Sequence, residues 1–264
     1  MVAIGVLMSN QLAAALEWIA AENTTLDKFC QIESFSWGQR YLWPQGPDHG
    51  KFNFIRLLDK GIDKNRFDSI VGEQEKAFKK HSKTLNIKIP DSVFPSPPGF
   101  LASYGITGSP LISILLRHTS IPELVARDSI SIRECEDEDD LEEFIRVNAS
   151  GRDWSPDRPV YEVIRNSFGT RADVKKYYLL YVGDDPACTA SIDYFGDKFN
   201  LCLLATHKDF QRCGLMNYLN TWIAKKVEKD FYVQVNNDEP SFQYYSNLDG
   251  AQIVNTEVKY ALTT

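Results

Sequence analysis

A hydrophobic stretch runs directly into a polar loop, a glycine and an amphipathic helix between residues 203 and 227. Leu203 and Leu204 open the stretch, Gly214 ends the loop, and apolar residues then recur at helical spacing. The first amides of such a helix have no partner within it. Together with the positive end of the helix dipole, they can bind a phosphate or pyrophosphate. Because glycine allows an unusual φ and close backbone approach, this turn is a candidate anion site.

The segments around this turn predict an α+β protein built on one sheet. Alternating apolar residues predict strands, and apolar residues three and four apart predict helices. The strands are expected at 129–135, 176–182, 187–195, 199–205, 231–235 and 251–262, and the helices at 137–148, 160–168, 215–227 and 241–248. In the N-terminal half, strands are expected at 52–58, 85–89 and 111–116, with a helix whose apolar stripe spans 67–78.

Composition excludes several classes of protein. With 43% hydrophobic residues the chain can bury a core, and no apolar run reaches the roughly 18 residues that span a bilayer. The net charge of −7 argues against a nucleic-acid partner.

Five scattered cysteines without a CxxC pair argue against a disulfide framework and a metal site. The apolar residues at the start of the sequence lack the basic residues of a signal peptide. We therefore expect a cytoplasmic protein with no membrane partner.

The run from Gln211 to Met216 resembles the acetyl-coenzyme A signature of the GNAT-superfamily N-acetyltransferases. That signature reads (Gln/Arg)-x-x-Gly-x-(Gly/Ala), and here it is Gln211-x-x-Gly214-x-Met216. Met216 departs from the pattern, since the family prefers Gly or Ala there. The preceding strand and the following amphipathic helix fit the family as well.

A second stretch resembles the family's next motif, a strand ending in Asn, a short helix bearing Tyr, and a Gly. Here the strand ends at Val235, Asn236 and Asn237, and Tyr245 and Gly250 follow. The family's tyrosine protonates the thiolate of coenzyme A as it leaves. The resemblance gives this role to Tyr245 first, with Tyr244 as the second choice, and adds Asn237 to the cofactor-binding residues.

The resemblance implies a mixed, mostly antiparallel sheet flanked by helices, in which the strands at 199–205 and 231–235 run parallel and splay apart. Acetyl-CoA would enter the wedge between them. Backbone groups of Leu204 and Thr206 would pair with the pantetheine. The resemblance also implies that Gln211 binds the cofactor. It further implies that the pyrophosphate accepts hydrogen bonds from the backbone amides of Arg212, Cys213, Gly214, Leu215, Met216 and Asn217.

The general base is not visible in the motif, because residues 199–204 contain no carboxylate. Asp193 on the preceding strand is a candidate catalytic base, and the alternatives are a water chain or an exposed, inert Asp193. The loop 151–156 lies where the family builds its acceptor site. Trp154 and Tyr161 either line that site or fasten the loop to the core.

The matched motifs fall in the C-terminal half, so we expect a GNAT-like acetyltransferase domain at 126–264 and an N-terminal α/β domain at 1–125. The order strand, helix, strand, strand occurs in both halves. The N-terminal half is therefore either a degenerate tandem copy that lacks the phosphate signature or an unrelated α/β cap.

Two functions follow from these expectations. The first is an N-acetyltransferase that moves an acetyl group from acetyl-CoA to a primary amine by direct attack in a ternary complex. Its acceptor is a small molecule or a protein, and the acidic half, with 15 basic and 23 acidic residues over 129–264, either attracts a cationic acceptor or only keeps the protein soluble. The second is a catalytically inactive module that binds CoA or a partner. A weaker alternative is an interaction surface in the Pro-rich stretch 93–116. No motif in the sequence predicts the oligomeric state.

Overall fold

The last strand, β12 (Gln252–Ala261), lies almost wholly in the same compact unit as the N-terminal residues. The computed structural model describes residues 2–27, 29–94, 99, 101, 105–106, 110–170 and 172–261. It forms two compact units, one of Met1–Ile114, Val235–Ser246 and Ile253–Thr264, the other of Leu115–Gln234 and Asn247–Gln252. Within the first unit, β12 from the end of the chain pairs with β4 (Asn86–Pro90) of the N-terminal half, with Val258 opposite Ile89.

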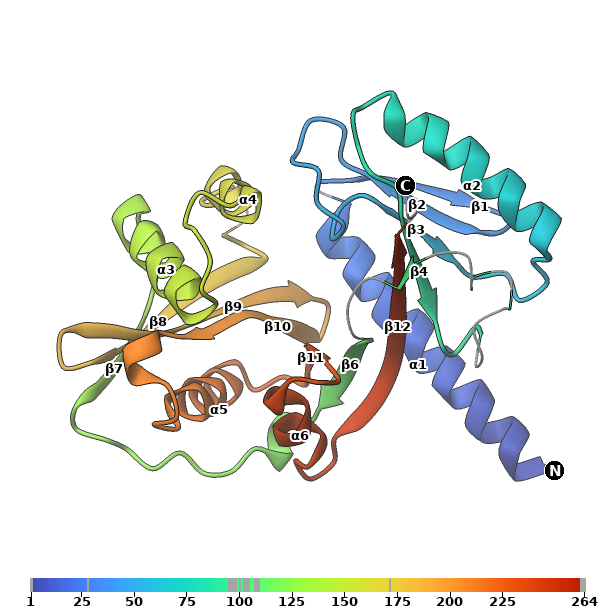
Figure 1. Cartoon of the computed structure of the whole chain (residues 1–264). Helices are drawn as coiled ribbons and strands as arrows, with labels where there is room; N and C mark the ends of the chain where they lie inside the picture. The colour runs from blue at the N-terminus through green and yellow to red at the C-terminus, as the bar shows by residue number, and fades with distance from the viewer. Residues whose placement is uncertain are drawn as a thin grey trace. The chain divides into compact units, whose positions relative to one another are not determined.

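The first unit contains a mixed sheet with the strand order β1, β2, β3, β4, β12, β6, and β5 pairs with β12. The helix α2 crosses over between β3 and β4, which run parallel, while β1 with β2 and β2 with β3 are antiparallel. The remaining elements of this unit are α1 (Val2–Leu26), β1 (Gln31–Phe35), β2 (Gly38–Leu42), β3 (Phe54–Leu57), α2 (Lys64–Lys79), β5 (Gly105–Ile106), β6 (Leu111–Leu116) and α6 (Pro240–Ser246). Figure 1 shows α2 lying along one face of this sheet.

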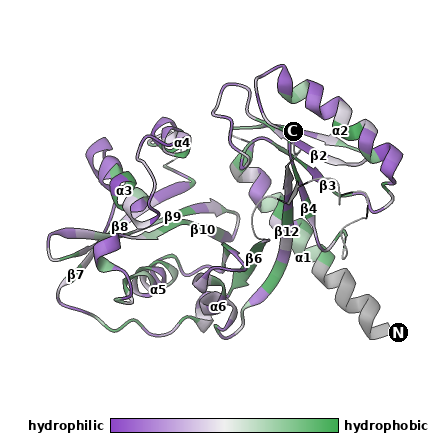
Figure 2. Ribbon diagram, in the orientation of Figure 1, coloured by the Kyte–Doolittle hydropathy of each residue, from purple (hydrophilic) through white to green (hydrophobic). Residues whose placement is uncertain are grey.

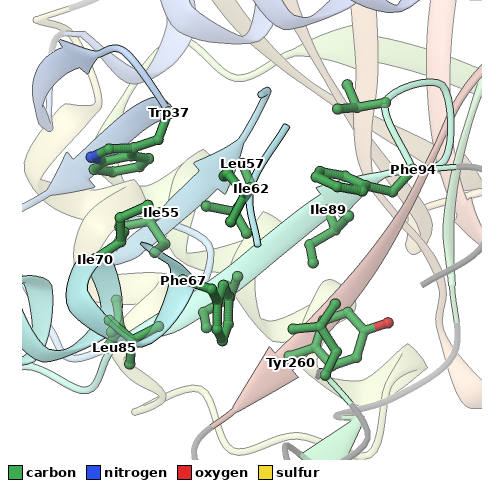
Figure 3. Packing of buried hydrophobic residues seen from close by; sticks show 14 of the residues in the cluster. Trp37, Ile55, Leu57, Ile62, Phe67, Ile70, Leu85, Ile89, Phe94 and Tyr260 are labelled. Carbon is green, nitrogen blue, oxygen red and sulfur yellow. The ribbon is translucent and has the colours of Figure 1, made fainter. Parts of the chain in front are cut away.

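The two faces of β3 and β4 bury different chemistry. Ile55 and Leu57 alternate with Arg56 along β3, and Ile87 and Ile89 alternate with Lys88 along β4. The isoleucines and leucine join Phe67 and Ile70 of α2 in a hydrophobic cluster that Figure 3 shows from close by. Because successive side chains of a strand point to opposite faces, Arg56 and Lys88 lie on the face away from this cluster.

On that opposite face, buried charges tie α1 and β12 to the sheet. Arg56 is fully buried; its Nε lies 2.6 Å from Glu257 Oε1, and its Nη2 lies 2.5 Å from Glu22 Oε2. Lys88 Nζ lies 3.5 Å from Glu22 and 3.8 Å from Glu257, and Arg56 also donates to the hydroxyl of Tyr41 at 2.9 Å. Two cations thus face two carboxylates, and the buried charge balances.

The second unit contains a sheet with the order β11, β10, β9, β8, β7. Neighbouring strands are antiparallel except β10 and β11, which run parallel and are connected by α5. The strands are β7 (Ile130–Glu134), β8 (Lys175–Val182), β9 (Asp185–Phe195), β10 (Lys198–Thr206) and β11 (Phe231–Asn236). The helices are α3 (Glu138–Gly151), α4 (Pro159–Ser167) and α5 (Leu215–Val227).

Helices cover both faces of this second sheet. Phe144 of α3 and Tyr161 of α4 join Tyr177 and Leu179 in one core, whereas Trp222 of α5 contacts Tyr178, the next residue along β8. Figure 1 shows α3 and α4 on one side of the strands and α5 on the other. In Figure 2, α2 and α3 carry both hydrophilic and hydrophobic residues, as expected for helices with one buried face. Within the described residues, no helix has the length and apolar character to cross a membrane.

The α+β class and the repeated order of elements are confirmed. All the helices and strands expected from the sequence are present, with ends displaced by a few residues. The structure adds α1 and the hairpin of β1 and β2, which the sequence analysis did not predict. Most of the Pro-rich stretch at 94–99, and much of the suggested interaction surface at 93–116, lie outside the described residues.

The buried charges predict how the stability of the protein depends on pH. Burial disfavours the Glu22 carboxylate, but Lys88 and Arg56 outweigh that cost and lower its pKa from 4.5 to about 2. A carboxyl group whose pKa is lower in the folded state contributes stability above pH 4.5 and loses it as the pH falls toward 2. We expect Glu22 to contribute about 3 kcal/mol at neutral pH.

Urea unfolding at a series of pH values tests this expectation. The Glu22→Gln variant should lose a similar free energy of unfolding at pH 7 and show a weaker decline in acid than the wild type. Asp68→Asn removes an exposed ion pair with Lys64 and should cost less than about 1 kcal/mol. Equal losses in the two variants would contradict the role given to Glu22.

Candidate functional site

Strand β10 is paired with β11 only at its beginning. The parallel register joins Phe199 to Phe231 and Leu201 to Val233, although β10 continues to Thr206 and β11 to Asn236. Both strands are fully described, and neither pairs with the other beyond these residues. The family resemblance implied that these two strands run parallel and then separate, and their pairing agrees with this expectation. After Leu201, the backbone edge of β10 that faces β11 has no hydrogen-bond partner on that strand.

A bulge in β10 lies where this pairing ends. On its other edge, Cys202 pairs with Ser191 and Ala205 with Thr189, so β10 carries one residue more than β9 between these pairs. Leu203 has a φ of +52°, a left-handed conformation that is uncommon for a residue with a side chain. The bulge turns the backbone of residues 203 and 204 out of the regular ladder.

A buried hydrogen-bond network holds the bulge. Asn148 of α3 is fully buried, and its Nδ2 donates to the carbonyl oxygen of Leu203 at 2.6 Å and to Thr189 Oγ1 at 2.9 Å. The Asn148 Oδ1 atom accepts from the hydroxyl of Tyr161 at 2.9 Å. Thr189 and Tyr161 are fully buried and Leu203 is half-buried, so the network supplies hydrogen bonds where the bulge removes those of the ladder. Sequence analysis missed it, although an Asn on the apolar face of the helix is a visible signal.

The C-terminal end of α3 packs closely against the last residues of β10. A Cβ atom at Gly151 would lie 2.4 Å from the carbonyl oxygen of Thr206, a distance that requires a shift of the backbone. The next residue, Arg152, donates from Nη2 to the carbonyl oxygen of Leu204 at 3.0 Å. The glycine therefore allows α3 to approach the strand at the bulge.

The loop after β10 leads into α5, and no side chain caps the first turn of that helix. A short 3-10 helix spans Lys208–Phe210, and Arg212 and Gly214 have φ values of +64° and +73°. Gly214 is the N-cap residue and offers no capping side chain, and residues 211–214 are exposed. The first amides of α5 therefore lack an intrahelical partner and face a site where an anion can bind.

The corresponding helix in the first unit starts differently. Its N-cap is Asp63, whose side chain accepts from the backbone N–H of Arg66 at 2.8 Å. This carboxylate already supplies the negative charge that the helix start favours. The start of α2 therefore holds a carboxylate, whereas the start of α5 has no capping side chain.

The structure places the expected cofactor-binding residues in two groups. Those of the second unit follow one another along β10, the loop and the first turn of α5, namely Leu204, Thr206, Gln211, Arg212, Cys213, Gly214, Leu215, Met216 and Asn217. Asn237 and Tyr245 belong to the first unit. Asn237 donates its backbone N–H to Pro110 at 3.2 Å, and Tyr245 on α6 is buried, with its ring 5.0 Å from that of half-buried Tyr244.

Asp193 is not an exposed strand residue, so that alternative is wrong. It is 3% exposed, because β9 is an interior strand paired with β8 and β10. Its Oδ1 lies 2.5 Å from Lys175 Nζ, and its Oδ2 accepts from Cys202 Sγ at 3.3 Å. Burial opposes the charge of Lys175, but the Asp193 carboxylate outweighs burial and raises the pKa of Lys175 well above its ordinary value.

The loop between α3 and α4 is fastened to the core. Tyr161 is fully buried and bonded to Asn148, so it supports the bulge from within. Trp154 is half-buried; its ring centre lies 6.4 Å from that of Tyr161, and the guanidinium of Arg158 lies 4.3 Å above the Trp154 ring. Of the two alternatives for these aromatic residues, the contacts of Tyr161 favour a structural role.

Comparison with known proteins identifies the fold. No protein-family model matches the sequence, and no curated protein matches it. A GCN5-related N-acetyltransferase from Kribbella flavida has a TM-score of 0.70 at 14% identity, over 97% of this chain and 96% of that one. A functionally unknown conserved protein from Staphylococcus epidermidis also has a TM-score of 0.70, at 10% identity, over 88% and 94% of the two chains.

A tandem GNAT protein from the clavulanic acid biosynthesis pathway has a TM-score of 0.53 at 11% identity, over 78% of this chain and 74% of that one. The chain therefore has the fold of the GNAT acetyltransferases, including their tandem form, and the resemblance carried by Gln211 and Gly214 is confirmed at the level of the fold. The mixed sheet flanked by helices is the one that this resemblance implies.

The close packing at Gly151 predicts opposite effects of two glycine substitutions. Gly151→Ala forces Cβ against the Thr206 carbonyl and should lower the free energy of unfolding by about 1–3 kcal/mol. Gly72→Ala, in α2 with no atom within 4 Å of the added Cβ, should raise it by about 0.4–1 kcal/mol. Urea unfolding of both variants measures the two changes. Equal stability of the variants would show that α3 does not need this glycine.

Proposed function

We propose that the protein is an acyl-CoA-dependent N-acyltransferase that transfers an acetyl group from acetyl-CoA to a primary amine. The observation that carries the proposal is the unpaired edge of β10 beyond Leu201, which leads directly into the open start of α5. An extended chain of amides can pair with such an edge, and a pyrophosphate can bind at such a helix start. The pantetheine and pyrophosphate of coenzyme A have these two features in this order.

Each part of the second unit has a task in this proposal. The backbone amides from Arg212 to Asn217 bind the pyrophosphate, and the backbone of Leu204 and Thr206 pairs with the pantetheine. Arg152 occupies one lone pair of the Leu204 carbonyl, and a carbonyl oxygen has two. A backbone N–H of β10 stabilises the charge that develops on the thioester oxygen when the amine attacks.

Catalysis then depends mainly on holding the two substrates together. Alignment of an amine and a thioester in one site is worth up to roughly 7–11 kcal/mol of the barrier. Tyr245 is proposed to protonate the departing thiolate, a role that rests on the family resemblance. A tyrosine hydroxyl has an ordinary pKa near 10, so it can supply a proton at neutral pH. Asp193 or a water chain remains the proposed route for the ammonium proton.

The second candidate is a module that binds CoA without turnover. The observation that favours it is Met216, a half-buried residue in the first turn of α5 where the family prefers Gly or Ala. Retained binding of acetyl-CoA together with no transfer to any amine would favour this function. The acceptor itself is proposed as an amine of unspecified size, with a cationic molecule favoured by the acidic C-terminal half.

Calorimetry with acetyl-CoA tests the binding site. The wild type should bind with a Kd of roughly micromolar, about −8 kcal/mol. Gly214→Asp places a carboxylate at the pyrophosphate position and should weaken binding at least about tenfold. Gly169→Asp is the matched control, because Gly169 has a φ of +72°, against +73° at Gly214, and neither has an atom within 4 Å of an added Cβ. Absent binding by the folded wild type, or an equal loss in both variants, would overturn the proposed function.

Turnover with a panel of amines tests the proton donor. Coenzyme A release should be followed with a polyamine, an aminoglycoside and a lysine-rich peptide as acceptors. Tyr245→Phe should lower kcat by about 10²-fold or more while acetyl-CoA affinity stays unchanged, because only the departing thiolate needs the proton. Tyr244→Phe, on the same helix, should leave kcat unchanged. The opposite ranking of the two variants would move the role to Tyr244.

A further inference from the structure

Cys202 differs from the other cysteines in its position and surroundings. It is half-exposed and is the last residue of β10 in regular register with β9 before the bulge at Leu203. Cys30, Cys135 and Cys188 are buried, and burial raises their pKa values to about 12, 12 and 11. Cys202 directly follows Leu201, the last residue of β10 that pairs with β11, so its backbone begins the strand edge where, under the proposed function, the thioester would lie.

Polar groups surround this thiol on the sheet face covered by α3 and α4. The Sγ atom donates to Asp193 Oδ2 at 3.3 Å, and Ser191 Oγ donates to Sγ at 3.5 Å. The Lys175 ammonium lies 2.5 Å from the other oxygen of Asp193. The four side chains come from β8, β9 and β10, so paired strands fix their positions. This cluster joins a nucleophile to a carboxylate and a cation.

The cluster can change the protonation of the thiol without changing its total charge. If the proton moves from Cys202 Sγ to Asp193 Oδ2, a thiolate replaces the carboxylate as the partner of the Lys175 cation. The thiolate, not the thiol, is the nucleophile of cysteine, and a neighbouring cation favours it. An adjacent base and a third group that orients the base are the general features of an activated nucleophile.

We propose that Cys202 accepts an acyl group from a bound acyl-CoA thioester. Sγ attacks the thioester carbonyl carbon and forms a new carbon–sulfur bond, while the bond from that carbon to the coenzyme A sulfur breaks. The proton that Sγ gives to Asp193 returns to the departing coenzyme A thiolate. The products are an S-acyl cysteine and free coenzyme A, and no oxidant or reductant is needed. The proposal rests on the proposed function, since it uses the same donor and strand edge.

Mass spectrometry of the protein after incubation with acetyl-CoA and no amine tests the proposal. One acetyl group should appear on the peptide that contains Cys202, and neutral hydroxylamine should remove it. Free N-acetylcysteine, added to the same incubation, serves as the control for reaction of a thiol with acetyl-CoA from solution. The Cys202 peptide should carry at least about tenfold more acetyl, because a bound thioester reacts at a high effective concentration. Cys202→Ser should abolish the hydroxylamine-sensitive acetyl group, and calorimetry should show that this variant still binds acetyl-CoA.

The result for Gly214→Asp separates this proposal from the proposed function. Acetylation of Cys202 should fall at least about tenfold in this variant, together with acetyl-CoA binding, and stay unchanged in Gly169→Asp. Binding without acetylation of Cys202 would overturn the role of Cys202 and leave the proposed function standing. Equal acetylation of Cys202 and the added free thiol, or acetylation that persists in Gly214→Asp, would show reaction from solution only and would also overturn it. Absent binding by the wild type would overturn both.

Discussion

The hydrogen bonds from Asn148 to the Leu203 carbonyl and Thr189 are the constraint on which the second unit depends. A bulge removes regular ladder bonds, and a buried carbonyl without a partner costs about 1–3 kcal/mol. The Leu203 carbonyl accepts from Asn148 of a neighbouring helix at 2.6 Å and from Thr189 of the adjacent strand at 3.2 Å. The bulge in turn ends the regular β10 ladder beside the free strand edge and directs the chain toward the loop before α5. One buried amide thus connects the core to the exposed site.

The two units use one topology for different purposes. In each, a helix connects two parallel strands, β3 with β4 and β10 with β11. In the first unit, one face of the parallel pair carries Arg56 and Lys88, and two carboxylates from distant parts of the chain neutralise them. Such a network is costly to break and leaves little room for a ligand at the same atoms. In the first unit these buried ion pairs therefore stabilise the fold. In the second unit, the edge of β10 and the start of α5 have no such partners.

Sequence patterns predicted the elements whose more buried and more exposed residues recur regularly, such as β7, α3 and α5. They did not reveal β1, which is exposed on both faces, or α1, whose first turn has no acidic residue and whose last turn has no basic one. The pairing of β12 with β4 joins residues about 170 positions apart and leaves no local signal. Within the site, Gly214 was recognisable from its motif. The contacts of Asp193 with Lys175 and Cys202 were not, because they depend on strand register.

The difference between Asp63 and Gly214 as helix N-caps has a consequence for ligand stoichiometry. Two structurally similar units would ordinarily offer two equivalent helix starts to an anion. Asp63 fills the start of α2 with a tethered carboxylate, which is present at an effective concentration that a free anion cannot match. An anion that binds at the remaining helix start does so once per chain. Under the proposed function, the protein would therefore bind one coenzyme A per chain.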